Sequence, residues 1–562
     1  MTAAPIVNVG LRLSETARHN PQGLAVAMPR GRGADGKYVY DEVTFRQLDE
    51  DSTRIAAGLR EMGVRPGTRL VLLVPPSIEF ISLTFALFKA GVVTILIDPG
   101  MGRANLIKCL AESEPEGFVG IPLAQALRAL LRWRFPRAKY NVTLGRRWFW
   151  GGKTLAQLRA QDASGFQPTA TQAQDPAAII FTTGSTGPPK GVLYRHGNFN
   201  QQVDEIRDFY RIEPGEIDLP GFPLFALFNC AMGVSTVIPD MDPTRPARVN
   251  PQNIIDHIRD YQITQAFGSP ALWNVVGRHC EKQDIVLPTL RRVLSAGAPV
   301  PPHVLWRMKQ AIAKEGDVHT PYGATESLPV ASISASEVLA QTAARSGTGA
   351  GTCVGRRFPG MEWKVIGITD GPIPTLSQAR ELPLGEIGEL IVCGGVVTTE
   401  YVTRKDANAL HKIQDGERFW HRMGDVGYLE ADPAATPRGE RFWFCGRKSQ
   451  RVITAKGTLF TITCEAIFNG HERIYRSALV GVGPPGAQRP VLIAEPWPEK
   501  RPTDKQDEER LVAELLARGG EFPHTAGIRD IFLLETLPTD IRHNAKIFRE
   551  KLAVWAEKKL VR

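Results

Sequence analysis

Residues 179–191 read I-I-F-T-T-G-S-T-G-P-P-K-G, an apolar run that leads into glycines and small hydroxyl side chains and closes on a lysine. Small residues let backbone N–H groups approach an anion, hydroxyls add hydrogen-bond donors, and lysine adds positive charge. The stretch therefore predicts a strand followed by a phosphate-binding loop. Its spacing is not the G-x-x-x-x-G-K-[ST] of P-loop NTPases, which disfavours a simple kinase or GTPase. The candidate phosphate-binding residues are Thr182, Thr183, Gly184, Ser185, Thr186, Gly187 and Lys190.

On both sides of this loop, short apolar runs alternate with segments of helical spacing. Residues 70–74 and 92–97 read as strands that flank a helix over 77–89, and similar alternation recurs between 177 and 210 and between 254 and 314. Repeated strand–helix alternation predicts an α/β fold with mostly parallel sheets covered by helices. A chain of 562 residues is too long for one hydrophobic core, so we expect two or three packed units.

The strand–helix alternation gives way to short β-type runs in the last third of the sequence. Short β-type runs at 388–393 and 441–444, separated by turn residues, predict a β-rich subdomain at about 350–445. The polar, glycine-containing segment 446–450 is suited to a hinge. We therefore expect a large N-terminal domain over 1–445 and a small, mobile α+β C-terminal domain over 451–562.

The net charge is +9, with an isoelectric point of about 9.2. Such a charge fits a nucleic acid, an anionic membrane surface or an anionic substrate, and cannot choose among them. Much of the excess falls in 128–150, where arginines are interleaved with tryptophans and phenylalanines. The preferred interpretation is a solvated basic face over a partly buried aromatic set. Contact with an acyl chain or a membrane surface ranks second, and nucleic acid, which we do not expect as a partner, ranks third.

The cysteines and histidines argue against a metal cage. The seven cysteines are scattered, odd in number and without C-x-x-C spacing, which favours a reducing cytoplasm. We expect neither a signal peptide nor a membrane span. The histidines at 196, 319, 411 and 421 have no metal-ligand spacing, so each is interpreted as a packing or loop residue. The glycines of 347–351 lack the G-x-G-x-x-G spacing and are interpreted as a loop.

The phosphate-loop motif resembles the signature of the adenylate-forming superfamily, which includes acyl-CoA synthetases, luciferases and nonribosomal-peptide adenylation domains. The resemblance extends along nearly the whole chain, and residues 89–99 look like an early K-A-G segment that ends in D-P. S-A-G-A-P-V at 295–300 looks like the segment that lines the adenine, which implies contacts from Gly297, Ala298 and Pro299. The resemblance implies ATP and Mg²⁺ as cofactors.

Residues 322–326 read Y-G-A-T-E and resemble a second motif of the superfamily. The resemblance implies that Tyr322 stacks on adenine, that Thr325 meets the phosphate and that Glu326 holds the magnesium ion. A carboxylate is chemically suited to this role, since Mg²⁺ prefers oxygen ligands and commonly bridges a protein carboxylate and phosphates.

Three further positions match the superfamily in the second half of the chain. Asp425, in R-M-G-D-V-G-Y, matches the aspartate that bonds both ribose hydroxyls, and Arg447 matches the arginine before the hinge. Lys546, about 16 residues from the last residue, resembles the lysine that stabilises charge on the reacting carboxylate and α-phosphate. The implied catalytic set is Lys190, Thr325, Glu326 and Lys546.

The acyl-binding region and the hinge point to one subgroup. Residues 223–229 read P-L-F-A-L-F-N and stand where many acyl-CoA synthetases have a histidine-containing motif that guards the acyl tunnel. With the preceding residue, the resemblance implies a largely aromatic and aliphatic substrate wall that includes Phe222, Phe225, Phe228 and Asn229. Ser449 stands where many relatives carry aspartate, which weakens the case for a CoA-dependent second step. These sequence stretches resemble those of the β-lactone synthetases of bacterial long-chain olefin biosynthesis. The resemblance implies a long-chain 2-alkyl-3-hydroxy acid as substrate, a β-lactone, AMP and pyrophosphate as products, and assembly with other enzymes of that pathway.

Two alternatives remain open. A long-chain acyl-CoA ligase would share every nucleotide-binding residue and differ in its acceptor. A basic protein that binds nucleic acid or membranes without catalysis is disfavoured, because Lys190, Glu326, Asp425 and Lys546 are all present.

Overall fold

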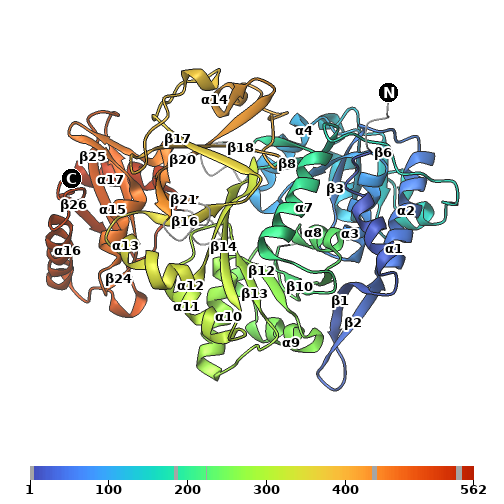
Figure 1. The fold of residues 1–562 in the computed structure, drawn as a ribbon, viewed down its shortest axis with the longest axis horizontal. Helices are drawn as coiled ribbons and strands as arrows, with labels where there is room; N and C mark the ends of the chain where they lie inside the picture. Colours follow the sequence, from blue (N-terminus) through green and yellow to red (C-terminus); the bar gives the residue numbers. More distant parts are fainter. Residues whose placement is uncertain (1–5, 183–187, 223, 433–438, 540–546, 562) are drawn as a thin grey trace.

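The computed structural model describes residues 6–182, 188–222, 224–432, 439–539 and 547–561. Its strands form two large sheets, one three-stranded sheet and one hairpin. In Figure 1 the larger sheet occupies the centre, the seven-stranded sheet lies at the right, and the three-stranded sheet with its helices lies at the left. The α/β class predicted from the strand–helix alternation is confirmed.

The larger sheet has fourteen strands. Its strands between residues 217 and 324 pair in parallel, and antiparallel strands between residues 317 and 447 extend it, so the β-type runs after residue 350 continue this sheet. Its order is β17 (Met361–Ile366), β18 (Gly388–Gly394), β20 (Arg418–Asp432), β21 (Gly439–Arg447), β16 (Thr352–Arg357), β15 (Ser327–Ser334), β14 (Asp317–Ala324), β13 (Arg292–Ser295), β12 (Gln265–Gly268), β10 (Ile217–Pro220), β11 (Ser235–Val237), β1 (Leu24–Arg32) and β2 (Tyr38–Thr44), with β19 (Lys412–Asp415) beside β20.

The seven-stranded sheet is parallel except at β9. Its order is β7 (Lys153–Thr154), β6 (Tyr140–Thr143), β5 (Gly117–Gly120), β3 (Arg69–Leu73), β4 (Val93–Leu96), β8 (Pro176–Phe181) and β9 (Gly191–Arg195). In the C-terminal part, β22 (Val452–Thr454) pairs with β23 (Gly457–Leu459), and β25 (Arg489–Pro496) lies between β24 (Ile474–Val482) and β26 (Asp530–Leu533).

Helices cover these sheets, and none in the described ranges is long and apolar enough to cross a membrane. They are α1 (Leu11–His19), α2 (Phe45–Glu61), α3 (Ile78–Lys89), α4 (Arg103–Glu112), α5 (Pro122–Leu130), α6 (Leu155–Arg159), α7 (His196–Tyr210), α8 (Phe225–Met232), α9 (Pro251–Tyr261), α10 (Pro270–Gln283), α11 (Pro302–Ala311), α12 (Ala335–Glu337), α13 (Ala343–Gly347), α14 (Ala407–His411), α15 (Thr461–Asn469), α16 (Lys505–Gly520) and α17 (Arg549–Leu560).

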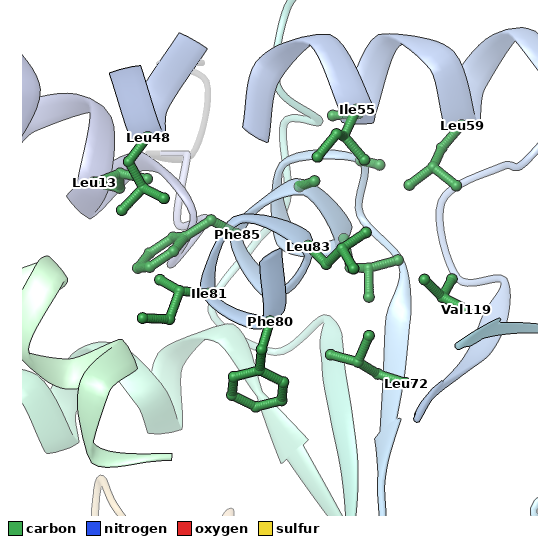
Figure 2. Packing of buried hydrophobic residues seen from close by; sticks show 14 of the residues in the cluster. Leu13, Leu48, Ile55, Leu59, Leu72, Phe80, Ile81, Leu83, Phe85 and Val119 are labelled. Atoms are coloured by element: carbon green, nitrogen blue, oxygen red, sulfur yellow. The ribbon is translucent and has the colours of Figure 1, made fainter. Parts of the chain in front are cut away.

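Helix α3 forms the centre of the N-terminal core. Every residue from Phe80 to Lys89 is buried, as expected for a helix that is apolar on all sides. Figure 2 shows its side chains packed between residues of α1, α2 and the strands β3 and β5. Lys89, at its end, is fully buried, and its ammonium group lies 2.6 Å from Asp49 Oδ1 and donates to Ser52 Oγ at 2.9 Å. The buried charge is thus paired and hydrogen-bonded, as burial requires.

Candidate active site

The phosphate-loop stretch joins β8 to its antiparallel neighbour β9. Thr182 N donates to Lys190 O at 3.0 Å, and Lys190 N donates to Thr182 Oγ1 at 3.1 Å, so these two residues close the loop at its base. The predicted ligands Thr183, Gly184, Ser185, Thr186 and Gly187 lie outside the described residues.

Tyr322, Asp425 and Arg447 come together from three strands. β20 pairs with β21 in a register that sets Asp425 opposite Arg447. The Tyr322 hydroxyl donates to Asp425 Oδ2 at 2.5 Å, and Arg447 Nη1 lies 2.9 Å from Asp425 Oδ1. Three residues that are far apart in the sequence therefore meet around one carboxylate.

The protonation states within this trio follow from burial. Burial raises the pKa of Asp425, while Arg447 and the Tyr322 hydrogen bond oppose that rise. Burial and the neighbouring carboxylate raise the pKa of Tyr322, so the phenol keeps its proton and remains a donor. Oδ1 of Asp425 has Arg447 Nη1 at 2.9 Å as its ion-pair partner, but it accepts no well-aligned hydrogen bond from the described part of the chain. A buried acceptor of this kind fits a ligand hydroxyl.

Glu326 is buried in the two-residue turn between β14 and β15, and residues 398–401 fix it there. The Tyr401 hydroxyl donates to Glu326 Oε1 at 2.6 Å. Thr398 donates from both N and Oγ1 to the Glu326 carbonyl oxygen, at 2.9 and 3.0 Å. Tyr194, on β9, donates to the carbonyl oxygen of Thr325 at 2.6 Å. The two motifs predicted to share the phosphate are thus tied together by β9.

Lys190 has neighbours that the sequence analysis missed. Its ammonium group lies 3.0 Å from His411 Nε2 and 4.7 Å from the centre of the Tyr401 ring. The ammonium group of Lys412 lies 5.6 Å from the same ring centre and donates to the Thr398 carbonyl oxygen. One tyrosine ring therefore has both lysines near it while its hydroxyl holds Glu326.

Burial sets the charges in this cluster. It lowers the pKa of His411 to about 4, helped by the Lys190 charge, so the imidazole is neutral near pH 7 and accepts a hydrogen bond from Lys190. Burial also lowers the pKa of Lys190, against the attraction of Glu326, and lowers the pKa of Lys412 to about 7. His411, interpreted from the sequence as a packing or loop residue, is instead in direct contact with the phosphate-loop lysine.

The predicted substrate wall is partly assembled. The Phe225 ring stacks on Phe267 with centroids 3.5 Å apart, and the Phe228 ring centroid lies 5.8 Å from that of Phe225. Phe222 and these two rings pack against the same buried cluster as Tyr322. The aromatic residues of α8 and the preceding loop therefore share a core with the adenine-side tyrosine.

Asn229 has a different role from the three phenylalanines. It is buried, and its amide nitrogen donates to Asp218 Oδ2 at 2.6 Å and to Thr236 Oγ1 at 3.2 Å. Because its donors are used by strands β10 and β11, the prediction that Asn229 lines the substrate wall is corrected: it anchors α8 to the sheet.

The remaining predicted residues are 297–299, which the structure describes, and Lys546, which it does not. Residues 297–299 follow the carboxyl end of β13, and Tyr322 lies near the carboxyl end of the neighbouring parallel strand β14. Gly297 adopts a φ of +95°, a conformation that favours glycine. Lys546 lies outside the described residues, between Thr539 and Ile547, which form an antiparallel bridge.

A family model for AMP-binding enzymes matches residues 13–402. The chain belongs to this family. It is therefore an ATP-dependent enzyme that forms AMP, and the superfamily predicted from the loop motif is confirmed.

Two relatives of this AMP-binding enzyme match along nearly their whole length. It is 46% identical over 563 residues to an olefin beta-lactone synthetase of Xanthomonas campestris pv. campestris, a match that covers 99% of this chain and 98% of the relative. It is 47% identical over 561 residues to an olefin beta-lactone synthetase of Stenotrophomonas maltophilia, with 98% of both chains covered.

Solved structures of low sequence identity show the fold. An anthranilate CoA ligase, AuaEII, in complex with anthranoyl-AMP matches with a TM-score of 0.77 at 18% identity, covering 99% of both chains. ATP-bound MatB from Rhodopseudomonas palustris matches with a TM-score of 0.77 at 19% identity, covering 98% of this chain and 99% of the other. This AMP-binding enzyme thus has the adenylate-forming fold.

Proposed function

We propose that this enzyme activates a 2-alkyl-3-hydroxyalkanoic acid and closes it to a β-lactone. The carboxylate attacks the α-phosphorus of ATP and pyrophosphate leaves. The 3-hydroxyl oxygen of the same molecule then bonds to the activated carbonyl carbon, the hydroxyl loses its proton, and the bond to AMP breaks. The observation that carries this proposal is the identity of 46% and 47%, over nearly the full length, with two olefin beta-lactone synthetases.

The nucleotide is assigned to the two clusters described above. We assign the ribose hydroxyls to Asp425, whose buried Oδ1 pairs with Arg447 but accepts no well-aligned hydrogen bond from the described residues. We assign the adenine to Tyr322 and residues 297–299, and the phosphates to Thr182, Lys190, Thr325 and the intervening loop. Arg447 pairs with Asp425 and favours its charged form, against the effect of burial.

Magnesium is assigned to Glu326. Its Oε1 accepts the Tyr401 hydrogen bond, and a single protein carboxylate together with substrate phosphates is a common donor set for Mg²⁺. A bound Mg²⁺ would neutralise part of the phosphate charge. The donor set fits, since Glu326 supplies a hard carboxylate and leaves the other coordination positions to phosphate oxygens and water.

Lys546 is proposed to stabilise charge on the reacting carboxylate and α-phosphate, and Phe222, Phe225 and Phe228 are proposed to contact the acyl chain. For Lys546 to reach the site, residues 446–450 would act as a hinge between 1–445 and a mobile domain of 451–562. In the second step, intramolecular attack gives the 3-hydroxyl a high effective concentration, and AMP is a leaving group strong enough for closure of a strained ring.

We also propose a cytoplasmic location and assembly with other enzymes of olefin biosynthesis. The location is supported by the seven cysteines, all buried and unbridged. Assembly is proposed from the likeness to two olefin beta-lactone synthetases.

The product analysis that tests the function compares two acids. With ATP and Mg²⁺ but no CoA, the 3-hydroxy acid should release AMP repeatedly and yield lactone by mass spectrometry. The matching 3-deoxy acid should stall after a burst of pyrophosphate, because its adenylate has no internal acceptor. A long-chain acyl-CoA ligase would instead turn over both acids, only with CoA, and accumulate thioesters. Thioester formation that keeps pace with ATP use, without lactone, would overturn β-lactone synthesis and leave adenylation standing.

A further inference from the structure

Helix α5 buries its polar side and exposes its apolar side. Gln125 is fully buried and donates to the carbonyl oxygens of Phe118 at 2.9 Å and Val142 at 2.8 Å, which fixes the helix to β5 and β6. The leucines at i, i+4 and i+7 share the outer face, and Leu123, Leu127 and Leu130 are 66%, 51% and 64% exposed. A surface helix ordinarily turns such a stripe toward the core.

Aromatic side chains extend this apolar face. Trp133, directly after α5, is 68% exposed, and Trp148 and Phe149, in the loop after β6, are 64% and 77% exposed. Trp150 is buried below them and stacks on Trp148 with ring centroids 6.2 Å apart. Arg128 joins the loop to the helix, because its Nη2 donates to the Trp150 carbonyl oxygen at 2.9 Å. The Leu–Trp surface consists of Leu123, Leu127, Leu130, Trp133, Trp148 and Phe149.

Positive charge accompanies the Leu–Trp surface. The sequence from 117 to 161 contains no aspartate or glutamate. The arginines next to its aromatic residues are exposed, and they are Arg132, Arg134, Arg146 and Arg147. The sequence predicts a partly buried aromatic set here. That expectation holds for Phe135 and Trp150 but is wrong for the three aromatic residues of the surface.

We propose that the Leu–Trp surface docks on an anionic lipid membrane. Leucine and tryptophan side chains enter the boundary between headgroups and acyl chains, and neighbouring arginines pair with anionic headgroups. Nucleic acid would use the arginines and aromatic rings but would leave the three leucines of α5 without a partner. The charge and the aliphatic stripe are both accounted for by a lipid surface.

The sheet topology separates this surface from the nucleotide site. α5 and the loop with Trp148 follow β5 and β6, whereas the phosphate loop follows β8, and β3 and β4 lie between them. All five strands are parallel, so the three connections leave the same carboxyl edge of the sheet. The surface and the phosphate loop are therefore separate, at the same edge of the sheet with two strands between them. Membrane docking does not depend on which acid the enzyme activates. If the substrate is the proposed 2-alkyl-3-hydroxyalkanoic acid, docking would bring the enzyme to the membrane in which this acid, with its two alkyl chains, dissolves.

Sedimentation of the full-length enzyme with vesicles tests the proposal. Vesicles of phosphatidylcholine and phosphatidylglycerol in equal parts should bind the enzyme, vesicles of phosphatidylcholine alone should bind it much less, and added salt should weaken binding. Trp148→Ser with Phe149→Ser should abolish binding. Arg146→Gln and Arg147→Gln should each weaken it about fivefold. Trp306→Ser is the matched control, since Trp306 is 47% exposed on α11.

Each outcome bears on the proposal separately from catalysis. Adenylation of a short, water-soluble acid without vesicles should be equal in all these variants, because none of the substituted residues belongs to the active site. Unchanged vesicle binding by the Trp148/Phe149 double variant would overturn the proposal, as would equal binding to both vesicle types. The surface would belong to a protein partner instead if the parent bound no vesicles but bound another enzyme of the same pathway, and if the double variant no longer bound that enzyme.

Discussion

The Tyr401 hydroxyl donates a hydrogen bond of 2.6 Å to Glu326 Oε1 across 75 residues of sequence. Burial and the Glu326 charge raise the pKa of Tyr401, so its hydroxyl keeps its proton and remains a donor. The hydrogen bond fixes the orientation of the carboxylate assigned to Mg²⁺. Tyr401 is therefore a positioning residue.

Tyr401→Phe should raise the Mg²⁺ concentration needed for half-maximal pyrophosphate exchange by about tenfold or more, since a hydrogen bond to a charged group contributes about 1.5–3 kcal/mol. Glu326→Gln should have a larger effect, because it removes the charge as well. Tyr210→Phe is the control, as its buried hydroxyl donates to Ser332 Oγ at 2.9 Å in another part of the core. An unaltered Mg²⁺ response in Tyr401→Phe would remove Tyr401 from the metal site.

His411→Leu should raise KM for ATP by about tenfold with little change in kcat. The substitution removes the neutral acceptor 3.0 Å from the Lys190 ammonium group. A lysine that is no longer held in place loses side-chain conformational entropy when phosphate binds, which weakens binding. His411→Gln should recover part of the loss because its carbonyl oxygen can accept. Steady-state kinetics of both variants check this, and equal KM values for parent and Leu variant would contradict it.

Asp425→Asn should weaken ATP binding by about 10- to 100-fold, measured by calorimetry. The amide retains the size of the side chain but loses the charge that pairs with Arg447 at 2.9 Å and one of the two acceptor oxygens assigned to the ribose. Asp415→Asn, on β19, removes a carboxylate that accepts from Trp420 Nε1 at 3.1 Å and should leave ATP affinity unaltered. Equal affinities in all three proteins would remove Asp425 from the nucleotide site.

Lys546→Ala should abolish AMP formation while ATP binding persists. This expectation follows from the motif match alone, since Lys546 lies outside the described residues. A lysine that stabilises charge developing between carboxylate and α-phosphate contributes to the transition state more than to ATP binding. Turnover equal to that of the parent would exclude Lys546 from the mechanism.

Local features of the fold were predictable from the sequence. The strand–helix alternation expected between residues 177 and 210 is confirmed by β8 and α7, and the strand expected before the phosphate loop is β8. Both depend on periodicity and turn chemistry within a short window.

The contacts that the sequence analysis missed depend on distant segments. His411 and Lys190 are 221 residues apart, and no spacing rule links them. Asn229 was assigned to the substrate wall from its neighbours in sequence, but the fold directs its amide to Asp218. The exposed leucines of α5 were missed for a related reason. Helical spacing identifies an apolar stripe but not whether a core faces it, and the hydrogen bonds of Gln125 to β5 and β6 decide that.

Asp218 makes stability depend on pH. It is 4% exposed, and burial raises its pKa to about 7, although Asn229 and Arg292 oppose the rise. An unfolded aspartate has a pKa of about 3.9, so between about pH 4 and pH 7 the folded state binds more protons than the unfolded state. The free energy of unfolding therefore falls as pH rises through this window, by up to about 4 kcal/mol. Asp218→Asn cannot ionise and is close in shape to the protonated acid. Its Tm relative to the parent should increase from about pH 5 to about pH 8 in thermal melts. A Tm difference that stays constant with pH would show that Asp218 is ionised throughout, with its charge balanced in the interior by Arg292 and the Asn229 amide.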